Sequence, residues 1–437
     1  MFHQILLSFL TIGFTVSFAV GQDAKSSAET PADAAAESAT ESPVKPSSGG
    51  PANVLDGMDP EEPVAVGNPE STIHEPEPFS PEQKVAIEAF IESRTRWADT
   101  LSELKAVGIR YSNDEDRSDA AKSRFQELRN LARTRMNETF DRAVELFQVR
   151  IGDYEAGSMM ATMLEYRESM SIYENSLEAA EALLKAELTY PFLYKIAARS
   201  AFLDGRYDRV MKHYNAFVEL NGVEKLDKID NVIASFLEVY PDYWKKEQEL
   251  RDAEAKADDL PRVLMETTRG PVTIELFENE APNTVANFIK LAEDGYYDGA
   301  DFYQVVDDFI AMGGDPVGDG TSTTGRFLPD EHQNPNSRQF FRGSLSMAKI
   351  PDPRDKNKYV PNSASSQFAI ALMPYISLDN QQTVFGRIID GMEAVSTFRR
   401  IDPTEKKEKS IQMPPDRIIS MKVIRKRPHS YDVKYTQ

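Results

Sequence analysis

The chain has 437 residues, carries a formal net charge of −21 and contains no cysteine. This acidic excess argues against binding to nucleic acid or to anionic lipid surfaces, because both carry charge of the same sign. The absence of cysteine excludes disulfide bonds, a lipid-modified cysteine and thiolate metal ligands. The five histidines are far apart in the sequence, so we expect no metal site and no cofactor.

Residues 1–21 have the features of a signal peptide. Residues 5–20 form a run of sixteen mostly apolar residues, shorter than the ~20 residues needed to cross a bilayer. Ala19 and Gly21 are the small residues that a signal peptidase reads. We expect cleavage after Gly21 and export, to the periplasm or by secretion. The residues before the apolar run include no Lys or Arg, which leaves an uncleaved membrane anchor as the alternative.

Residues 22–79 predict a disordered acidic linker. Ala, Ser, Pro and Glu dominate this segment, and no aromatic residue precedes Phe79 within it. Such a composition cannot bury enough apolar surface to offset the entropy of ordering the chain. We expect an extended tether, although the acidic run could also bind cations or basic partners.

Residues 80–258 predict an all-α domain. Ser80 can cap a helix, Pro81 suits the first helical position, and Gln83 can complete a capping box. The region that follows is rich in Ala, Leu, Glu, Arg and Met and shows no strand-like alternation. It is therefore expected to form several antiparallel helices.

An aromatic residue followed by an acidic one, at the start of an amphipathic run, recurs in this region at Phe140, Tyr173 and Tyr207, at intervals of 33 and 34 residues. That period is typical of tetratricopeptide repeats, whose concave face would hold a protein or peptide partner. The last copy, with Gly205 in the expected turn, is the most similar to a tetratricopeptide hairpin. An irregular helical bundle is the alternative.

From residue 262 onward the sequence changes to short apolar runs of β character. Gly313 and Gly314 end the run in residues 301–315, DFYQVVDDFIAMGGD, where they allow a sharp turn. Further motifs precede and follow it in a fixed order: residues 281–288 (APNTVANF), 344–348 (SLSMA), 366–368 (SQF) and 384–386 (VFG). Together these motifs resemble the cyclophilin-type peptidyl-prolyl cis-trans isomerase domain. The resemblance implies a closed antiparallel β-barrel with flanking helices over residues 262–428, followed by a tail at 429–437.

The resemblance also implies a set of site residues, several of which depart from the family pattern. Gln304 stands where the family has its catalytic arginine, and Phe309 and Gln367 match two further catalytic positions. The other positions are expected to contact the substrate: Ile310, Met312, Ala348, Lys349, Ala369, Leu378 and Gln382. No residue at these positions suggests a metal ligand set.

Residues 349–358 insert a basic loop beside the implied groove. Its positive side chains could contact an acidic peptide, or the insertion could be a solvated loop.

The chemistry of prolyl rotation explains why the departure at Gln304 matters. Rotation about the peptide bond has a barrier of ~18–20 kcal/mol, and an enzyme must favour the twisted state, in which the prolyl nitrogen becomes a hydrogen-bond acceptor. An arginine donates a charge-assisted bond to that nitrogen, whereas a glutamine donates a neutral bond about half as strong.

The sequence therefore predicts a peptidyl-prolyl isomerase that acts on Xaa-Pro segments of client proteins, assists the folding of exported proteins and is weakened by Gln304. The alternative is a non-catalytic chaperone or scaffold that binds proline-containing segments while the helical domain recruits a partner.

Overall fold

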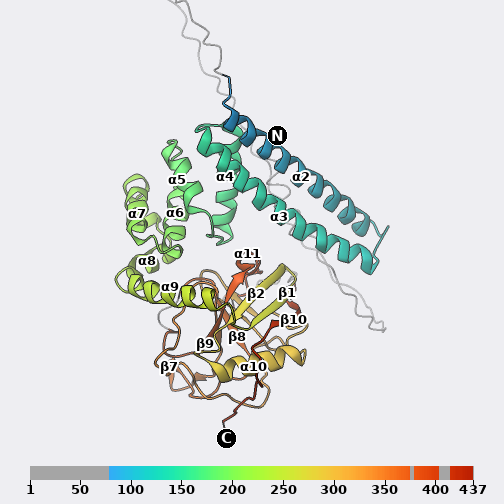
Figure 1. Cartoon of the computed structure of the whole chain (residues 1–437), viewed down its shortest axis with the longest axis vertical. Coiled ribbons are helices and arrows are strands. Elements are labelled where there is room, and N and C mark those ends of the chain that lie inside the picture. Colours follow the sequence, from blue (N-terminus) through green and yellow to red (C-terminus); the bar gives the residue numbers. More distant parts are fainter. Residues whose placement is uncertain (1–77, 375–377, 403–413, 437) are drawn as a thin grey trace, which may run out of the picture. The chain divides into compact units, whose positions relative to one another are not determined.

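The computed structural model of the protein describes residues 78–374, 378–402 and 414–436. In sequence order, a helical part is followed by a part built around a β-sheet, coloured from blue to green and from yellow to red in Figure 1. The expected signal peptide and almost all of the expected linker lie outside the described residues. No helix among the described residues combines the length and the apolar character needed to cross a membrane.

The helical part consists of consecutive α-helices joined by short turns. Its elements are α2 (Pro81–Ser112), α3 (Asp119–Val149), α4 (Tyr154–Ser169), α5 (Leu177–Lys185), α6 (Pro191–Leu203), α7 (Tyr207–Asn221), the 3-10 turn η1 (Val223–Lys225), α8 (Lys228–Phe236) and α9 (Tyr240–Ala257).

Helix α2 begins as the sequence predicts. The Ser80 hydroxyl accepts a hydrogen bond from the Gln83 backbone N–H, and the Gln83 side chain accepts one from the Ser80 N–H, both at 3.1 Å. Pro81 occupies the first turn, where its missing N–H costs nothing. The predicted capping box is therefore confirmed.

The three aromatic residues at intervals of 33 and 34 do not occupy equivalent positions. Tyr207 begins α7, but Phe140 lies inside the long helix α3, and Tyr173 lies in the loop between α4 and α5. The predicted hairpin of α6 and α7 is present, and the three alanines of α6, Ala197, Ala198 and Ala201, are fully buried. The tetratricopeptide character of this hairpin stays a prediction.

The second part contains a curled antiparallel sheet. Its elements are β1 (Arg262–Thr267), β2 (Gly270–Leu276), α10 (Pro282–Glu293), β3 (Gln304–Val306), β4 (Ile310–Gly313), β5 (Ser344–Met347), β6 (Pro351–Asp352), β7 (Asp355–Tyr359), β8 (Phe368–Ala371), β9 (Val384–Asp390), α11 (Met392–Ser396) and β10 (Ile418–Arg425). Eight strands pair in the order β10-β1-β2-β9-β5-β8-β4-β3, and β6 pairs with β7 in a small separate hairpin. The insertion at residues 349–358, which the sequence predicts to be a loop, therefore contains this hairpin.

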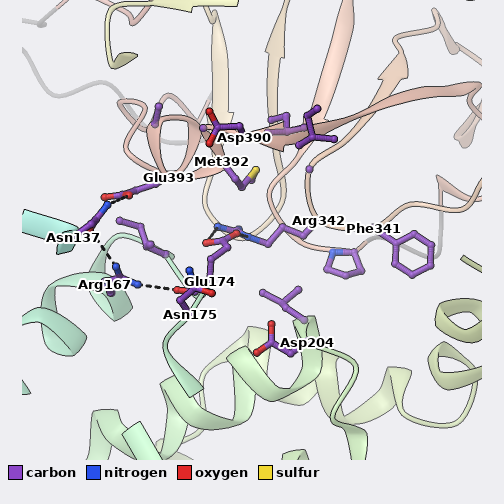
Figure 2. Close-up of a pocket in the computed structure, with 18 of the residues that line it drawn as sticks. Asn137, Arg167, Glu174, Asn175, Asp204, Phe341, Arg342, Asp390, Met392 and Glu393 are labelled. Carbon is purple, nitrogen blue, oxygen red and sulfur yellow. Dashed lines mark hydrogen bonds and ion pairs between the residues drawn. The ribbon is translucent and has the colours of Figure 1, made fainter. Parts of the chain in front are cut away.

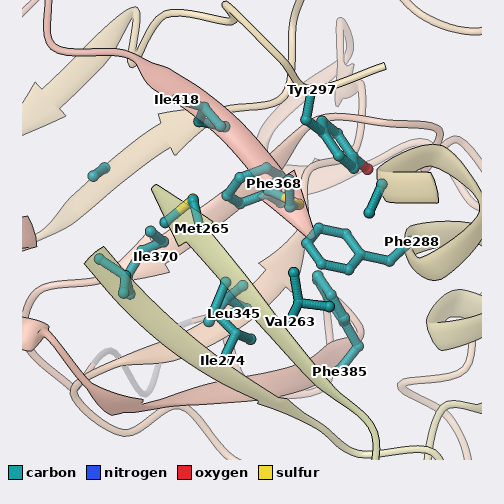
Figure 3. Packing of buried hydrophobic residues seen from close by; sticks show 14 of the residues in the cluster. Val263, Met265, Ile274, Phe288, Tyr297, Leu345, Phe368, Ile370, Phe385 and Ile418 are labelled. Carbon is teal, nitrogen blue, oxygen red and sulfur yellow. The ribbon is translucent and has the colours of Figure 1, made fainter. Parts of the chain in front are cut away.

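One face of the sheet packs into a single hydrophobic core. Phe288 from α10 lies 5.0 Å from the Phe385 ring and 5.6 Å from the Phe368 ring, measured between centroids. Figure 3 shows these rings together with Leu345 and Ile370 between the strands and the helix. Because side chains alternate along a strand, this core fixes which residues point to the opposite face.

The two end strands of the sheet approach each other without pairing directly. The Phe302 N–H donates to the Asp416 carbonyl and the Ile418 N–H to the Ala300 carbonyl, both at 2.8 Å. These bonds connect the segment before β3 to the start of β10. The sheet is therefore a curled half-barrel, and its full closure stays a prediction.

Helix α9 is attached to the sheet part by buried polar contacts. The Tyr240 hydroxyl donates to the Phe340 carbonyl at 2.6 Å, and Arg338 donates to Glu247 at 2.8 and 3.0 Å. Arg338, Glu247 and Tyr240 are all buried. The end of the helical part and the sheet part are thus joined by specific contacts.

Candidate active site

The site positions of the sheet strands share the face that points away from the core. In β4, Ala311 packs in the core, so Ile310 and Met312 point to the other side. In β8, Phe368 and Ile370 pack in the core, which places Ala369 on that same outer face. We call this surface the outer face.

The strand register aligns several of these residues in one row across the outer face. Gln304 of β3 is paired with Met312 of β4, Met312 with Ala369 of β8, and Ala369 with Ser346 of β5. Neighbouring strands are ~4.8 Å apart, so the row extends over roughly 14 Å. Gln304 therefore lies at one end of a short row whose next two members are apolar.

An apolar cluster lies beside this row. Leu378, Ala371 and Val384 belong to it, and Phe309 packs against it. Ala371 is paired with Ile310, two residues along β4 from Met312, so the cluster adjoins the row on the outer face. The predicted site residues Phe309 and Leu378 thus belong to the same apolar cluster.

Gln367 lies outside this cluster and is held by polar contacts. Its amide donates to the carbonyls of Ser322 at 2.7 Å and Gly320 at 3.1 Å, and its oxygen accepts from the Tyr303 hydroxyl at 2.7 Å. Gln367 precedes Ala369 by two residues, so alternation places it on the outer face as well. It lies ~13 Å along the chain from Ala371, at the polar end of the site.

Two predicted substrate contacts have structural partners instead of open surroundings. The Lys349 ammonium pairs with Asp330 at 2.7 Å, and both side chains are about 95% buried, at 4% and 5% exposed. The Ala348 N–H donates to the Gln367 carbonyl at 2.9 Å. The ion pair anchors the start of the insertion, and the contact of Lys349 with substrate stays a prediction.

Gln382 is positioned over the row by a side-chain hydrogen bond. The Ser346 hydroxyl donates to the Gln382 amide oxygen at 3.1 Å, and both residues are buried. Because Ser346 is the fourth member of the row, this bond places Gln382 at the end opposite Gln304.

A carboxyl group with a raised pKa adjoins the apolar cluster. Burial raises the pKa of Asp379 to about 7, although the hydrogen bond that its carboxylate accepts from the Phe340 N–H, at 2.9 Å, opposes the shift. Asp379 follows Leu378 directly. Prolyl rotation transfers no proton, so the consequence of this shift is electrostatic: it sets whether a charge stands beside the apolar cluster near neutral pH.

Two residues of the site were not expected from the sequence. Tyr303 fixes Gln367, and burial raises the pKa of its hydroxyl far above the ordinary value. Tyr303 directly precedes the predicted site residue Gln304 in residues 301–315, and this adjacency is the sequence feature that could have identified it. Tyr359 ends the β6–β7 hairpin and packs against the cluster of Leu378. Nothing in the local sequence indicated that contact, because it joins an insertion to a distant turn.

The described residues include no group of three or more His, Asp or Glu side chains arranged to hold a metal ion. On the outer face, these residues provide the Gln304 amide, the apolar members of the row and the adjoining apolar cluster. Such a face suits an extended peptide with a ring-shaped apolar residue.

Comparison with known proteins agrees with this geometry. Residues 262–423 match the family model described as "Cyclophilin type peptidyl-prolyl cis-trans isomerase/CLD". Peptidyl-prolyl cis-trans isomerase-like 1 of Rhizopus delemar is 42% identical over 136 residues, which cover 30% of this chain and 76% of that protein. CYP18-2 of Arabidopsis thaliana, a peptidyl-prolyl cis-trans isomerase, is 41% identical over 31% of this chain and 78% of its own length. A peptidyl-prolyl cis-trans isomerase of Synechococcus elongatus is 36% identical over 38% of this chain and 97% of its own length.

The fold is the curled antiparallel sheet with a packed helix that the family match implies. The chain belongs to the cyclophilin-type peptidyl-prolyl cis-trans isomerase family through its residues 262–423.

Proposed function

We propose that the protein is a peptidyl-prolyl cis-trans isomerase that turns over Xaa-Pro bonds slowly. Family membership supports the reaction, and the row of Gln304, Met312 and Ala369 beside the cluster of Phe309 and Leu378 supports the substrate. The register of this row is the observation that carries the proposal. It supports the proposal because Gln304, the only amide donor of the row's first three members, lies directly beside the two apolar members Met312 and Ala369.

The weak turnover follows from the chemistry of that donor. A charge-assisted hydrogen bond contributes ~1.5–3 kcal/mol, about twice the contribution of a neutral bond. If Gln304 supplies a neutral bond in place of a charged one, the barrier rises by about 0.8–1.5 kcal/mol. The rate is then lower by roughly four- to thirteenfold than it would be with arginine at this position.

The experiment is a protease-coupled assay of an Ala-Pro tetrapeptide on the full chain, with a matched series at one position. Gln304→Arg adds a charged donor, whereas Gln304→Met removes the donor and keeps the length of the side chain. The proposal expects activity to increase in the order Met, Gln, Arg. Equal rates in all three proteins would overturn it.

A second candidate function is a proline-binding module without useful turnover. Met312 and Ala369 favour it, because the row between Gln304 and Ser346 is apolar and can hold a ring without polarising the peptide bond. Peptide binding by calorimetry together with no turnover, even in Gln304→Arg, would select this function. Absence of both binding and turnover would reject both functions.

We further propose that the protein is exported and assists the folding of exported clients. The apolar run at residues 5–20 and the small residues Ala19 and Gly21, which a signal peptidase reads, support export. Mass spectrometry of the protein from fractionated cells tests this proposal. A mature chain that begins after Gly21 in the exported fraction is expected, and an intact chain in the cytosolic fraction would contradict export.

Two structural proposals accompany this function. The bonds of Phe302 and Ile418 to the opposite end of the sheet support a barrel that closes through these segments. The small buried residues Ala197 and Ala201 of α6, opposite α7, support a tetratricopeptide-like hairpin that holds a protein partner. Co-purification of a protein with the intact chain, but not with a variant altered on the α6–α7 surface, would test whether this hairpin binds a partner.

A further inference from the structure

The candidate site is attached to the helical part by one loop. Residues 170–176 join α4 to α5, and two of them contact the turn between β3 and β4. The Tyr173 hydroxyl donates to Asp308 at 3.0 Å, and the Ser171 hydroxyl donates to Asp307 at 3.4 Å. Asp307 and Asp308 make the turn that separates Gln304 from Phe309. The loop therefore contacts the segment that carries two predicted catalytic residues.

The turn needs such support because its backbone is strained. Asp308 has φ of 48°, in the left-handed region that costs a residue other than glycine about 1–2 kcal/mol. A hydrogen bond from a buried hydroxyl to the Asp308 carboxylate helps to offset that cost, because bonds to charged groups are the stronger ones. Tyr173 is 1% exposed, and burial raises its pKa, so its hydroxyl keeps its proton and remains a donor.

The position of Tyr173 is itself fixed from the helical side. The Ser200 hydroxyl of α6 donates to the Tyr173 carbonyl at 2.9 Å. Arg199 and Arg342 lie over the Tyr173 ring, at 6.0 and 5.3 Å from its centroid. These contacts hold the Tyr173 ring in place, so its hydroxyl is kept in position to donate to Asp308.

Arg342 makes a second connection between the loop and the site. It pairs with Glu174 at 2.5 Å and donates to the Ser171 carbonyl at 2.8 Å. On the sheet side it donates to the carbonyl of Leu372, whose N–H donates to the Phe309 carbonyl at 2.8 Å. The helical loop thus reaches Phe309 by two routes, through the turn and through Arg342.

Figure 2 shows this connection at the wall of a cavity of about 630 Å³, where Arg342 points at Glu174 from the sheet side. The wall continues through Arg167, which donates to the Glu174 carbonyl at 2.8 Å and to Asn137 at 3.2 Å. Arg342 and Arg167 therefore bind Glu174 from two sides and hold the loop at the wall of the cavity.

We infer that Tyr173 is a positioning residue for the proline site: it holds the β3–β4 turn so that Phe309 and Gln304 keep their places on the outer face. The inference rests on the proposed function for its consequence in catalysis. The contact itself is a property of the fold and can be tested separately.

The experiment compares Tyr173→Phe with Tyr214→Phe in the full chain. Tyr214 is also buried, and its hydroxyl also donates to a carboxylate at 3.0 Å, that of Asp230, but the pair lies within the helical part. Both variants lose one hydroxyl and keep the ring, so both should fold. The control reports the effect of losing a buried Tyr–Asp bond away from the site.

The first readout is hydrogen–deuterium exchange of the backbone amides at residues 305–311. We expect exchange to become about fivefold faster in Tyr173→Phe and to be unchanged in Tyr214→Phe. The second readout is kcat/KM for the Ala-Pro tetrapeptide. It should fall about three- to tenfold in Tyr173→Phe and stay unchanged in Tyr214→Phe, because a misplaced Phe309 weakens binding and a misplaced Gln304 weakens the hydrogen bond made in the twisted state.

Unchanged exchange at residues 305–311, or an equal change in Tyr214→Phe, would overturn the inference. Failure of the proposed function gives a different result. If the wild-type protein neither binds nor turns over the peptide, the proposed function is rejected, and the contrast in exchange between the two variants still decides the role of Tyr173.

Discussion

Replacement of Arg338 by methionine is a direct test of how the helical part is held on the sheet part. The Arg338 side chain is 1% exposed and donates to Glu247 at 2.8 and 3.0 Å. It also pairs with Glu254, lies 3.6 Å from Glu280, and stacks 3.9 Å from the centroid of the Phe277 ring. One cation therefore faces three carboxyl groups in a buried environment. Arg338→Met removes the cation and keeps much of the volume.

The magnitude follows from what remains after the substitution. Removing one partner of a buried ion pair costs ~3–5 kcal/mol, because the other charge is left uncompensated. Arg251 still pairs with Glu247 at 2.8 Å, and Arg387 still pairs with Glu254 at 3.1 Å. These cations offset part of the loss, so we expect the free energy of unfolding to fall by about 3 kcal/mol. Urea denaturation at pH 7, followed by circular dichroism, measures it.

The loss should depend on pH with a definite sign. Burial raises the pKa of Glu280, and Arg338 opposes that shift. Without Arg338, the pKa of Glu280 in the folded protein should rise further above that of the unfolded chain. The folded variant then binds protons more tightly, so its stability increases as the pH falls. The difference from the wild type is expected to be smaller at pH 5 than at pH 7.

A matched control is Arg354→Met in the β6–β7 hairpin. Arg354 pairs with Asp352 at 3.0 Å, but its side chain is 87% exposed. An exposed ion pair contributes little to stability, so this variant should unfold at the same urea concentration as the wild type. A loss below about 1 kcal/mol in Arg338→Met, or a loss that does not change between pH 5 and 7, would refute the reasoning.

Two further substitutions test the surroundings of the site. Burial raises the pKa of Asp379 from its ordinary 3.8 to about 7. The folded protein therefore binds the Asp379 proton more tightly than the unfolded chain does. The stability that this proton contributes is lost as the pH rises from about 4 to 7. Asp379→Asn should therefore be more stable than the wild type in urea at pH 8 and gain less at pH 5; parallel pH profiles would contradict this. Gly314 has φ of 82°, and a Cβ there would lie 2.7 Å from the Ser366 carbonyl oxygen and 2.8 Å from the Phe368 ring. Gly314→Ala should lower the free energy of unfolding by at least about 2 kcal/mol in thermal denaturation, and a loss under half of that would show that the turn can adapt.

Local signals in the sequence predicted local structure well. The capping box of Ser80 and Gln83 involves residues three positions apart, so the sequence alone contains the whole interaction. The same holds for α10, which begins at Pro282 and is followed by Gly295 at φ of 69°. The β1–β2 hairpin likewise joins two strands that are neighbours in the chain, across a turn at Gly270.

Contacts between distant residues were not visible in the sequence. Lys349 was expected at the substrate, and its ammonium is paired with Asp330, nineteen positions earlier and buried with it. Burial of a charged lysine requires a partner of opposite charge, but the amino-acid sequence alone does not identify that partner. The interval of 33 residues between Phe140 and Tyr173 does not mark equivalent positions in two helical repeats. A fixed spacing of aromatic residues does not determine where helices begin, and one of the two lies inside a helix.

The contacts between the helical and sheet parts also could not be predicted, since Arg338 and Glu247 are 91 positions apart. They change how the candidate site should be understood. A chain shortened to residues 262–428 would keep the outer face, the row of Gln304 and the cluster of Phe309. It would lose Glu247, which compensates Arg338, and Tyr173, which supports the strained turn at Asp308. The sheet part can therefore be recognised alone, but the activity of the site has to be measured in the full chain.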